Sequence, residues 1–349
     1  MKVFNILLTN KQSIVYDTLI EAQNEDSAIK IAHESYPDCQ FQPGLKTYAS
    51  PKERFDFSIK KSICEGASIL PNVFINDGYS FGRMIRGRFY DRYLNIDIDT
   101  TKKLINNSIV RKYEEESKGH EITTGKFYSI ASSSRLAVSS FCVNRGQLEK
   151  VSAIGDVAVS NLEFEEGCPI PGVSEPQMDV TFDANGEKYF IEVKCHEIFD
   201  NHANVYLSEE YRVPLKLLLG IDTVEWGTAK VKINKKEVSV IGIKGKPLHP
   251  EDFELPKSKH HFDFKQFLCH LMGILSSKEY QEGRHINFFY LVYRSQDPSF
   301  SQLYADFESE ICAIIKRFQT IFKDQITFGL IYNSKFDTLR SLSPVIQNK

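Results

Sequence analysis

The chain has 349 residues, of which 42% are hydrophobic and 26% charged, a composition typical of a globular protein of about two domains rather than a disordered one. The net charge is only 43 − 46 = −3, no apolar run reaches the roughly 18 residues of a membrane span, and the first residues lack a secretory cleavage site. We therefore expect no membrane partner. The seven cysteines are scattered without a C-x-x-C pair, which excludes a disulfide scaffold or a cysteine zinc site and predicts a cytoplasmic protein.

The N-terminal region reads as a small ββα module. Residues 2–9 and 14–22 alternate like two strands, and Asn24 precedes an acidic first turn and a helical apolar rhythm. We therefore predict a module over residues 1–45 and a larger domain over 46–349. Our hypothesis for the module is recognition or dimerisation, the latter giving a homodimer.

Aromatic residues and arginines interleave over residues 81–94, which read FGRMIRGRFYDRYL. Arg83, Arg86 and Arg88 in this stretch suit phosphate contacts beside aromatic rings that stack on bases. The alternative is that the arginine stems cover a buried aromatic stripe and play a structural part.

The rest of the chain alternates strands and helices, which predicts an α/β fold with a mixed sheet. The expected elements are a helix at 135–143, a strand at 156–165, a hairpin at 177–195, an insertion at about 200–260, a helix at 262–277, a strand at 286–293, a helix at 302–321 and a strand at 326–332.

Acidic residues concentrate in one 60-residue stretch. Residues 151–210 hold 2 lysines against 13 acids, a net charge of −11, whereas residues 1–150 carry 21 − 18 = +3 and residues 211–349 carry 20 − 15 = +5. Such a run is either a solvated acidic face or a carboxylate cluster built to hold a divalent cation.

The order of residues within the stretch favours the second interpretation. Asn185-Gly186 lies between two alternating runs and is a strong signal for a two-residue hairpin turn. That turn pairs residues whose numbers sum to 371, so Asp179 lies opposite Glu192, with Lys194 on the same face. Directly opposed β-carbons are about 4.5–5.5 Å apart. Two carboxylates at that spacing suit Mg²⁺, whereas an ordinary surface hairpin is the structural alternative.

The pattern Asp179…Glu192-Val193-Lys194 resembles the active-site signature of the PD-(D/E)xK nuclease superfamily, which includes many restriction endonucleases. The order of the expected elements over about 130–295 is similar to the αβββαβ core of that family, with the 200–260 insertion after the third strand. One departure is Met178, which replaces the proline before the aspartate.

The resemblance implies a restriction-endonuclease-like fold and Mg²⁺-dependent cleavage of DNA of the restriction or defence type, with Mn²⁺ as the alternative metal. Asp179 and Glu192 would bind the metal with the Val193 carbonyl, and Lys194 would position or activate water. Glu165 would be an auxiliary acid, chosen over Glu163 on the same strand face.

The resemblance also suggests that Gln266 and His270, four residues apart on the 262–277 helix, face the site and its nucleic acid. Solvent-facing or structurally satisfied side chains are the alternative for this pair. For the whole chain, the competing class is a non-catalytic nucleic-acid-binding or assembly protein that keeps the fold.

Overall fold

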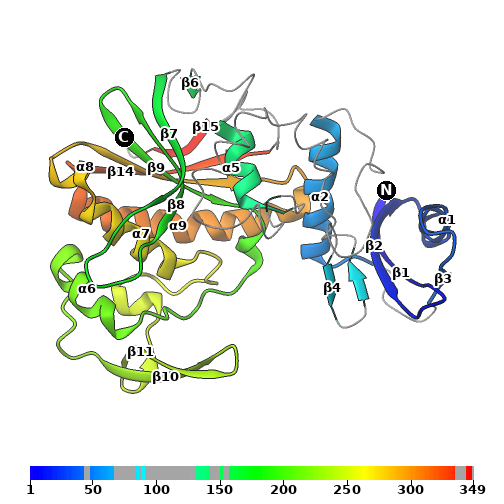
Figure 1. Ribbon diagram of the computed structural model, residues 1–349, viewed down its shortest axis with the longest axis horizontal. Coiled ribbons are helices and arrows are strands. Elements are labelled where there is room, and N and C mark those ends of the chain that lie inside the picture. The colour runs from blue at the N-terminus through cyan, green and yellow to red at the C-terminus, as the bar shows by residue number, and fades with distance from the viewer. Residues whose placement is uncertain are drawn as a thin grey trace. The chain divides into compact units, whose positions relative to one another are not determined.

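Figure 1 shows the computed structural model of the chain. The structure describes residues 1–42, 48–66, 83–85, 88–90, 127, 131–141, 150–151, 157–334 and 343–347. The described residues form a mixed α/β fold, and none of their helices is long and apolar enough to cross a membrane.

The chain divides into two compact units. The first contains residues Met1–Leu148, Tyr293–Pro298 and Asn333–Ser341, and the second contains Glu149–Val292, Ser299–Tyr332 and Leu342–Lys349. The boundary expected at residue 45 lies within 43–47, outside the described residues.

The first unit contains a five-stranded sheet in the order β3-β1-β2-β5-β4. Its elements are β1 (Lys2–Thr9), β2 (Val15–Ala22), α1 (Glu25–Ser35), β3 (Gln40–Phe41), α2 (Pro51–Gly66), β4 (Arg83–Ile85), β5 (Arg88–Tyr90) and α5 (Ser133–Phe141). The predicted ββα order is confirmed, and Asn24 caps α1 by accepting the Ser27 amide at 2.9 Å. Phe4, Ile6 and Leu8 of β1 form a small core with Ala28 and Ala32 of α1.

The second unit is built on a seven-stranded mixed sheet in the order β15-β14-β13-β9-β8-β7-β6. Its strands are β6 (Lys150–Val151), β7 (Val157–Gly167), β8 (Gln177–Ala184), β9 (Glu187–Lys194), β13 (Ile286–Tyr293), β14 (Ile326–Asn333) and β15 (Ser343–Gln347). β7, β8 and β9 form an antiparallel meander, and β13 pairs parallel to β9.

The β8/β9 hairpin has the predicted register. Asn185 and Gly186 form the turn with φ values of 52° and 82°, and pairing runs from Ala184↔Glu187 to Val180↔Ile191. Every pair sums to 371, so Asp179 and Glu192 occupy opposed positions one step beyond the last pair. The register prediction is confirmed.

Two long helices, α7 (Phe264–Ser276) and α9 (Ser301–Phe322), pack side by side. Phe267 of α7 lies 5.5 Å from Phe288 of β13 and 5.1 Å from Phe318 of α9, measured between ring centroids. These aromatic contacts hold α7 against β13, the strand that pairs with β9.

The 200–260 insertion forms ordered structure of its own. It contains α6 (Arg212–Leu219) and a three-stranded sheet of β10 (Gly227–Ile233), β11 (Lys236–Ile243) and β12 (Lys246–Pro247), with short helical turns η5 (Glu197–Phe199), η6 (Glu209–Tyr211) and η7 (Pro250–Phe253). After α7 come α8 (Lys278–Gln281) and, before α9, η8 (Pro298–Phe300). The sheet of this insertion was not predicted.

We expect Gly186→Ala to lower the free energy of unfolding by about 1 kcal/mol, because an added Cβ disfavours a φ of 82°. Chemical denaturation measures the change. Gly227→Ala is the matched control, since Gly227 has no positive φ and an added Cβ there would meet only an atom at 4.0 Å. Equal effects of the two substitutions would contradict the assigned turn.

Candidate active site

Asp179 holds the open end of the β8/β9 hairpin through its side chain. Its Oδ2 accepts the amide hydrogen of Val193 at 2.6 Å, at the point where the regular pairing of the two strands has ended. The neighbouring side chains of Met178, Val180 and Val193 are fully buried and anchor both strands from the opposite face. The carboxylate of Asp179 is therefore held beside the β9 backbone at the position where Glu192 and Lys194 project.

Glu192, Lys194 and Gln266 form a closed set of hydrogen bonds. The Lys194 ammonium donates to Glu192 Oε1 and to Gln266 Oε1, both at 2.6 Å, while Gln266 Nε2 donates to Glu192 Oε1 at 2.8 Å. Glu192 is only 2% exposed. Gln266 belongs to the first turn of α7, whose cap residue Asp263 accepts the Gln266 amide at 2.9 Å. The helix therefore positions the amide over the strand pair.

The second oxygen of Glu192 lies among further buried polar groups. His270 Nδ1 is 3.2 Å from Glu192 Oε2, and Tyr290 occupies the position next to Glu192 in the parallel β9/β13 pairing. Within the described part of the chain, Glu192 Oε2, His270 Nδ1 and the Tyr290 hydroxyl are buried without a hydrogen bond. Buried polar atoms usually have a partner, so these three groups are exceptions among the described residues.

Two further acids, Glu165 and Glu197, affect the pKa values of the opposed acids Asp179 and Glu192. Glu165 of β7 has a φ of 55°, and its negative charge helps raise the pKa of Glu192. Glu197 of η5 accepts the Cys195 amide at 2.7 Å, and its charge raises the pKa of both Asp179 and Glu192. Glu197 was missed from the sequence. Its signal was an acid three residues after the end of β9.

The pKa values of the site reflect burial and crowding of like charges. Burial raises the pKa of Asp179 well above its ordinary value, and the charge of Glu192 raises it further. Burial also raises the pKa of Glu192, although Lys194 opposes that change. For Lys194, burial lowers the pKa, but the charges of Glu192, Glu197 and Asp179 outweigh it and raise the pKa above its ordinary value. The lysine is therefore protonated.

His270 is neutral at physiological pH. Burial lowers its pKa to about 3, and the positive charge of Lys194 contributes. The imidazole is only 3% exposed and faces Glu192, so it lies inside the site and offers no surface to a nucleic acid. Gln266 likewise has its amide engaged with Glu192 and Lys194.

The donor set at Asp179 and Glu192 fits a hard divalent cation. Two carboxylates and the Val193 carbonyl offer oxygen atoms, and one carboxylate oxygen of Glu192 is buried without a hydrogen bond within the described residues. Among those residues no three His, Cys, Asp or Glu side chains form a ready metal cluster. Mg²⁺ fits such an incomplete set, because it commonly keeps several waters and uses one or two protein carboxylates.

Two of the three arginines proposed for nucleic-acid contact, Arg83 and Arg88, lie in strands of the first unit. Arg86 lies outside the described residues, and for Arg83 the structure describes only the backbone, in β4. Arg88 of β5 lies 3.8 Å from the buried carboxylate of Asp17 on β2. That ion pair gives Arg88 a structural contact within the five-stranded sheet.

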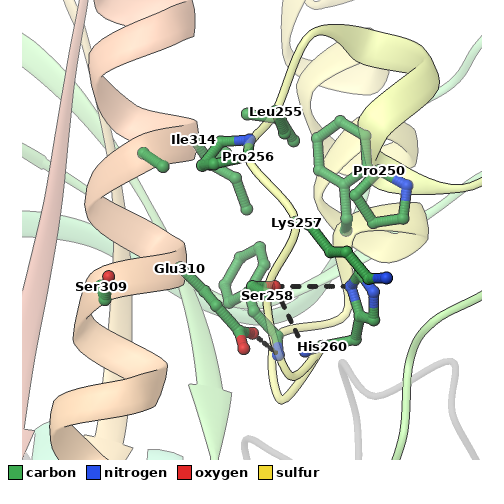
Figure 2. Close-up of a pocket in the computed structure, with 12 residues that line it drawn as sticks. Pro250, Leu255, Pro256, Lys257, Ser258, His260, Ser309, Glu310 and Ile314 are labelled. Carbon is green, nitrogen blue, oxygen red and sulfur yellow. Dashed lines mark hydrogen bonds between the residues drawn. The ribbon is translucent and has the colours of Figure 1, made fainter.

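A cavity of about 110 Å³ lies apart from the opposed acids, between α9 and residues 250–264 (Figure 2). Glu310 of α9 reaches toward this segment and accepts the Phe262 amide at 2.9 Å. Ser258 accepts the amide of His260, whose φ is 59°. These contacts fix the chain just before Asp263 and so determine where α7 begins.

No family model, no curated protein and no solved structure matches this chain.

We expect Asp179→Asn to raise the thermal unfolding midpoint by a few degrees in metal-free buffer near pH 8. The folded-state pKa of Asp179 is raised, so its carboxylate destabilises the fold once pH exceeds the unfolded-state value, and this cost grows until pH passes the folded-state pKa. The advantage of the variant should therefore shrink as pH falls, because the wild-type carboxyl becomes protonated. Thermal unfolding followed across a pH series measures this.

Asp183→Asn is the matched control on the same strand. Asp183 lies 2.8 Å from Arg284 and accepts a hydrogen bond from Asn161 at 2.6 Å, so removal of its charge should destabilise the protein. A midpoint for Asp179→Asn below that of the wild type at pH 8 would contradict the assigned charge crowding.

Proposed function

We propose that this chain is a Mg²⁺-dependent endonuclease that hydrolyses DNA phosphodiester bonds, with a restriction-endonuclease-like core. The observation that supports this proposal most directly is the set of Asp179, Glu192 and Lys194 at the open end of one hairpin in a mixed sheet. The chain order of β7, β8, β9, α7 and β13 in the second unit supports the proposed core, and α5, which belongs to the first unit, precedes them in the sequence.

Asp179, Glu192 and the Val193 carbonyl would hold the cation, for which Mn²⁺ is the alternative. A bound Mg²⁺ would supply Lewis-acid polarisation of the scissile phosphate and lower the pKa of a coordinated water. Residues of this chain would do the remaining work of holding the water and the phosphate in line and of keeping the acids in place.

Lys194 is suited to electrostatic work rather than to proton abstraction. Its ammonium is protonated and rigidly held by Glu192 and Gln266, so it can hold the attacking water or stabilise negative charge at phosphorus. In the reaction, water forms a new bond to phosphorus, the bond to the leaving oxygen breaks, and that oxygen ends with a proton.

Gln266 would act as a positioning residue. Its amide bonds Glu192 through nitrogen and Lys194 through oxygen, so one side chain of α7 sets the orientation of both groups. Glu165 would be an auxiliary acid near the pair, as its electrostatic effect on Glu192 indicates.

The second candidate is a nucleic-acid-binding or assembly protein that keeps the fold without turnover. The observation that favours it is the closed pairing of Lys194, whose ammonium already contacts both Glu192 and Gln266. The two candidates differ in whether Lys194 affects a chemical rate.

We expect Lys194→Gln to lower the rate of Mg²⁺-dependent DNA cleavage by roughly 10² or more, the scale of a lost electrostatic group in an active site. Duplex binding should change little. The thermal midpoint should fall, because Glu192 loses its buried counter-charge, so cleavage is compared at a temperature at which both proteins are folded. Plasmid nicking and single-turnover cleavage measure the rate.

Lys216→Gln is the control for cleavage, since Lys216 is an exposed lysine of α6 in the same unit. Cleavage by Lys194→Gln at the wild-type rate would refute the assignment of the cleavage reaction to this site. Absence of any metal-dependent cleavage by the wild type, with duplex binding intact, would instead favour the second candidate.

A further inference from the structure

A strongly basic hairpin extends from the insertion of the second unit. Residues 227–247, which we call the basic ribbon, contain six lysines and one acid, a net charge of 6 − 1 = +5. The lysines are Lys230, Lys232, Lys235, Lys236, Lys244 and Lys246. All six are exposed. The net charge of the ribbon therefore equals that of the whole of residues 211–349, which is 20 − 15 = +5.

Little of this charge is neutralised by neighbouring groups. Lys230 lies 2.9 Å from Glu237, the one acid of the ribbon. The other five lysines make no ion pair within the described part of the chain. Five exposed ammonium groups on one narrow element create a positive field that solvent and salt alone would screen.

The ribbon consists of the β10/β11 hairpin and the two-residue strand β12, and it has lysines at both of its turns. β10 and β11 pair antiparallel from Gly227↔Gly242 to Ile233↔Lys236, and Figure 1 shows the hairpin projecting from the rest of its unit. The tip is Asn234-Lys235, with φ values of 50° and 66°. The second turn is Lys244-Gly245, with φ values of 52° and 75°.

The lysine at the tip is a costly choice for the backbone. The same turn in the β8/β9 hairpin uses Asn185-Gly186, and glycine is the residue that adopts a positive φ without a steric penalty. At the ribbon tip the position of that glycine is taken by Lys235. A charged side chain is therefore present where the fold alone would favour glycine.

The ribbon is attached rigidly at its base. Arg212 of α6 donates to the carbonyl oxygens of Trp226 at 2.6 Å and Gly227 at 2.9 Å. Glu209 accepts the Thr228 hydroxyl at 2.8 Å and pairs with Arg212 at 2.8 Å. The start of β10 is thus held by two charged side chains, which limits how far the ribbon can pivot.

Aromatic contacts link the ribbon base to the helix of the candidate active site. The ring of Trp226 lies 5.4 Å from that of Phe253, which lies 5.0 Å from that of Phe264 at the start of α7. α7 also carries Gln266, which contacts Glu192 and Lys194. The ribbon and the site therefore share one packed framework within the second unit.

We propose that the basic ribbon binds the phosphate backbone of a double-stranded nucleic acid. Exposed lysines neutralise phosphates and release counterions, and a two-stranded β-ribbon has a width that a duplex groove admits. Five unpaired lysines on a ribbon with two tight lysine-bearing turns match this regular array of negative charge. The proposal rests on the ribbon and does not depend on hydrolysis at Asp179 and Glu192.

The test measures binding of the full chain to a labelled 30-base-pair DNA duplex in EDTA, over a series of salt concentrations. The variant is K232Q/K235Q/K236Q, and the matched control is K216Q/K278Q/K323Q, which removes three exposed lysines elsewhere in the same unit. We expect the ribbon variant to bind about tenfold or more weakly near 0.1 M salt. The slope of log affinity against log salt should become shallower by about 2–3, since each phosphate contact contributes about 0.9.

Equal affinity and salt slope for the ribbon variant and the control would overturn the proposal. Anionic lipid vesicles and poly-glutamate serve as competing probes. If the ribbon variant lost binding to the vesicles or to poly-glutamate but bound the duplex as tightly as the wild type, the proposal would also be overturned. EDTA removes divalent metal, so the binding result can be interpreted even if the nuclease proposal fails. Duplex binding without cleavage would support the ribbon proposal but not the nuclease proposal.

A single substitution separates binding from folding. Lys235→Gly relieves the positive-φ strain at the tip, so the thermal midpoint should rise or stay unchanged. Duplex affinity should nevertheless fall by severalfold because a phosphate contact is lost. Unchanged duplex affinity in this variant would remove Lys235 from the interface and would contradict the role assigned to the tip.

Discussion

The hydrogen bond from the Val193 amide to the Asp179 carboxylate is the contact on which the rest of the site depends. It replaces backbone pairing at the open end of the β8/β9 hairpin and so ends the regular pairing between the two strands. A hydrogen bond to a charged group contributes about 1.5–3 kcal/mol, which offsets part of the repulsion between Asp179 and Glu192. With that bond in place, Glu192 and Lys194 project from β9 toward α7.

The site as a whole carries more negative than positive charge. Lys194 compensates one carboxylate, but Asp179, Glu192 and Glu197 all act on its pKa, and Glu165 acts on that of Glu192. A fold selected only for stability would not bury opposed acids, because unpaired buried charges are costly. The proposed cation would balance this crowding, and this is the physical reason for proposing a metal at the cluster.

The parts that the sequence could predict are those determined by local chemistry. Asn185-Gly186 specifies its turn because both residues adopt a positive φ, and the turn alone determines which residues are opposed. Helix α7 follows from its apolar run and its Asp263 cap, and β13 has the expected limits, Ile286–Tyr293. In the 200–260 insertion the alternation was obscured, because the tip turn is Asn234-Lys235 and lacks the glycine that marks a hairpin.

Parts of the site that depend on long-range packing could not be predicted. Tyr290 comes beside Glu192 only because β13 pairs parallel to β9, and the register of that pairing is set by contacts distant in sequence. Glu197 returns to the site because η5 turns the chain directly after β9. The spacing of Gln266 and His270 suggested one shared face, but not that His270 would be buried against Glu192.

The second unit places opposite charges on one framework. Its acidic site would repel a phosphate backbone in the absence of a cation, whereas the basic ribbon would attract one. The Debye length is about 8–10 Å at physiological salt, so each charge cluster acts mainly on the part of a polyanion nearest to it. Under the two proposals, attraction at the ribbon would hold a duplex without cancelling the repulsion at the acids, which a bound cation would relieve. The contacts from Trp226 through Phe253 to Phe264 keep the ribbon base and the helix of Gln266 in one packed body, which would give the two proposed roles a common framework.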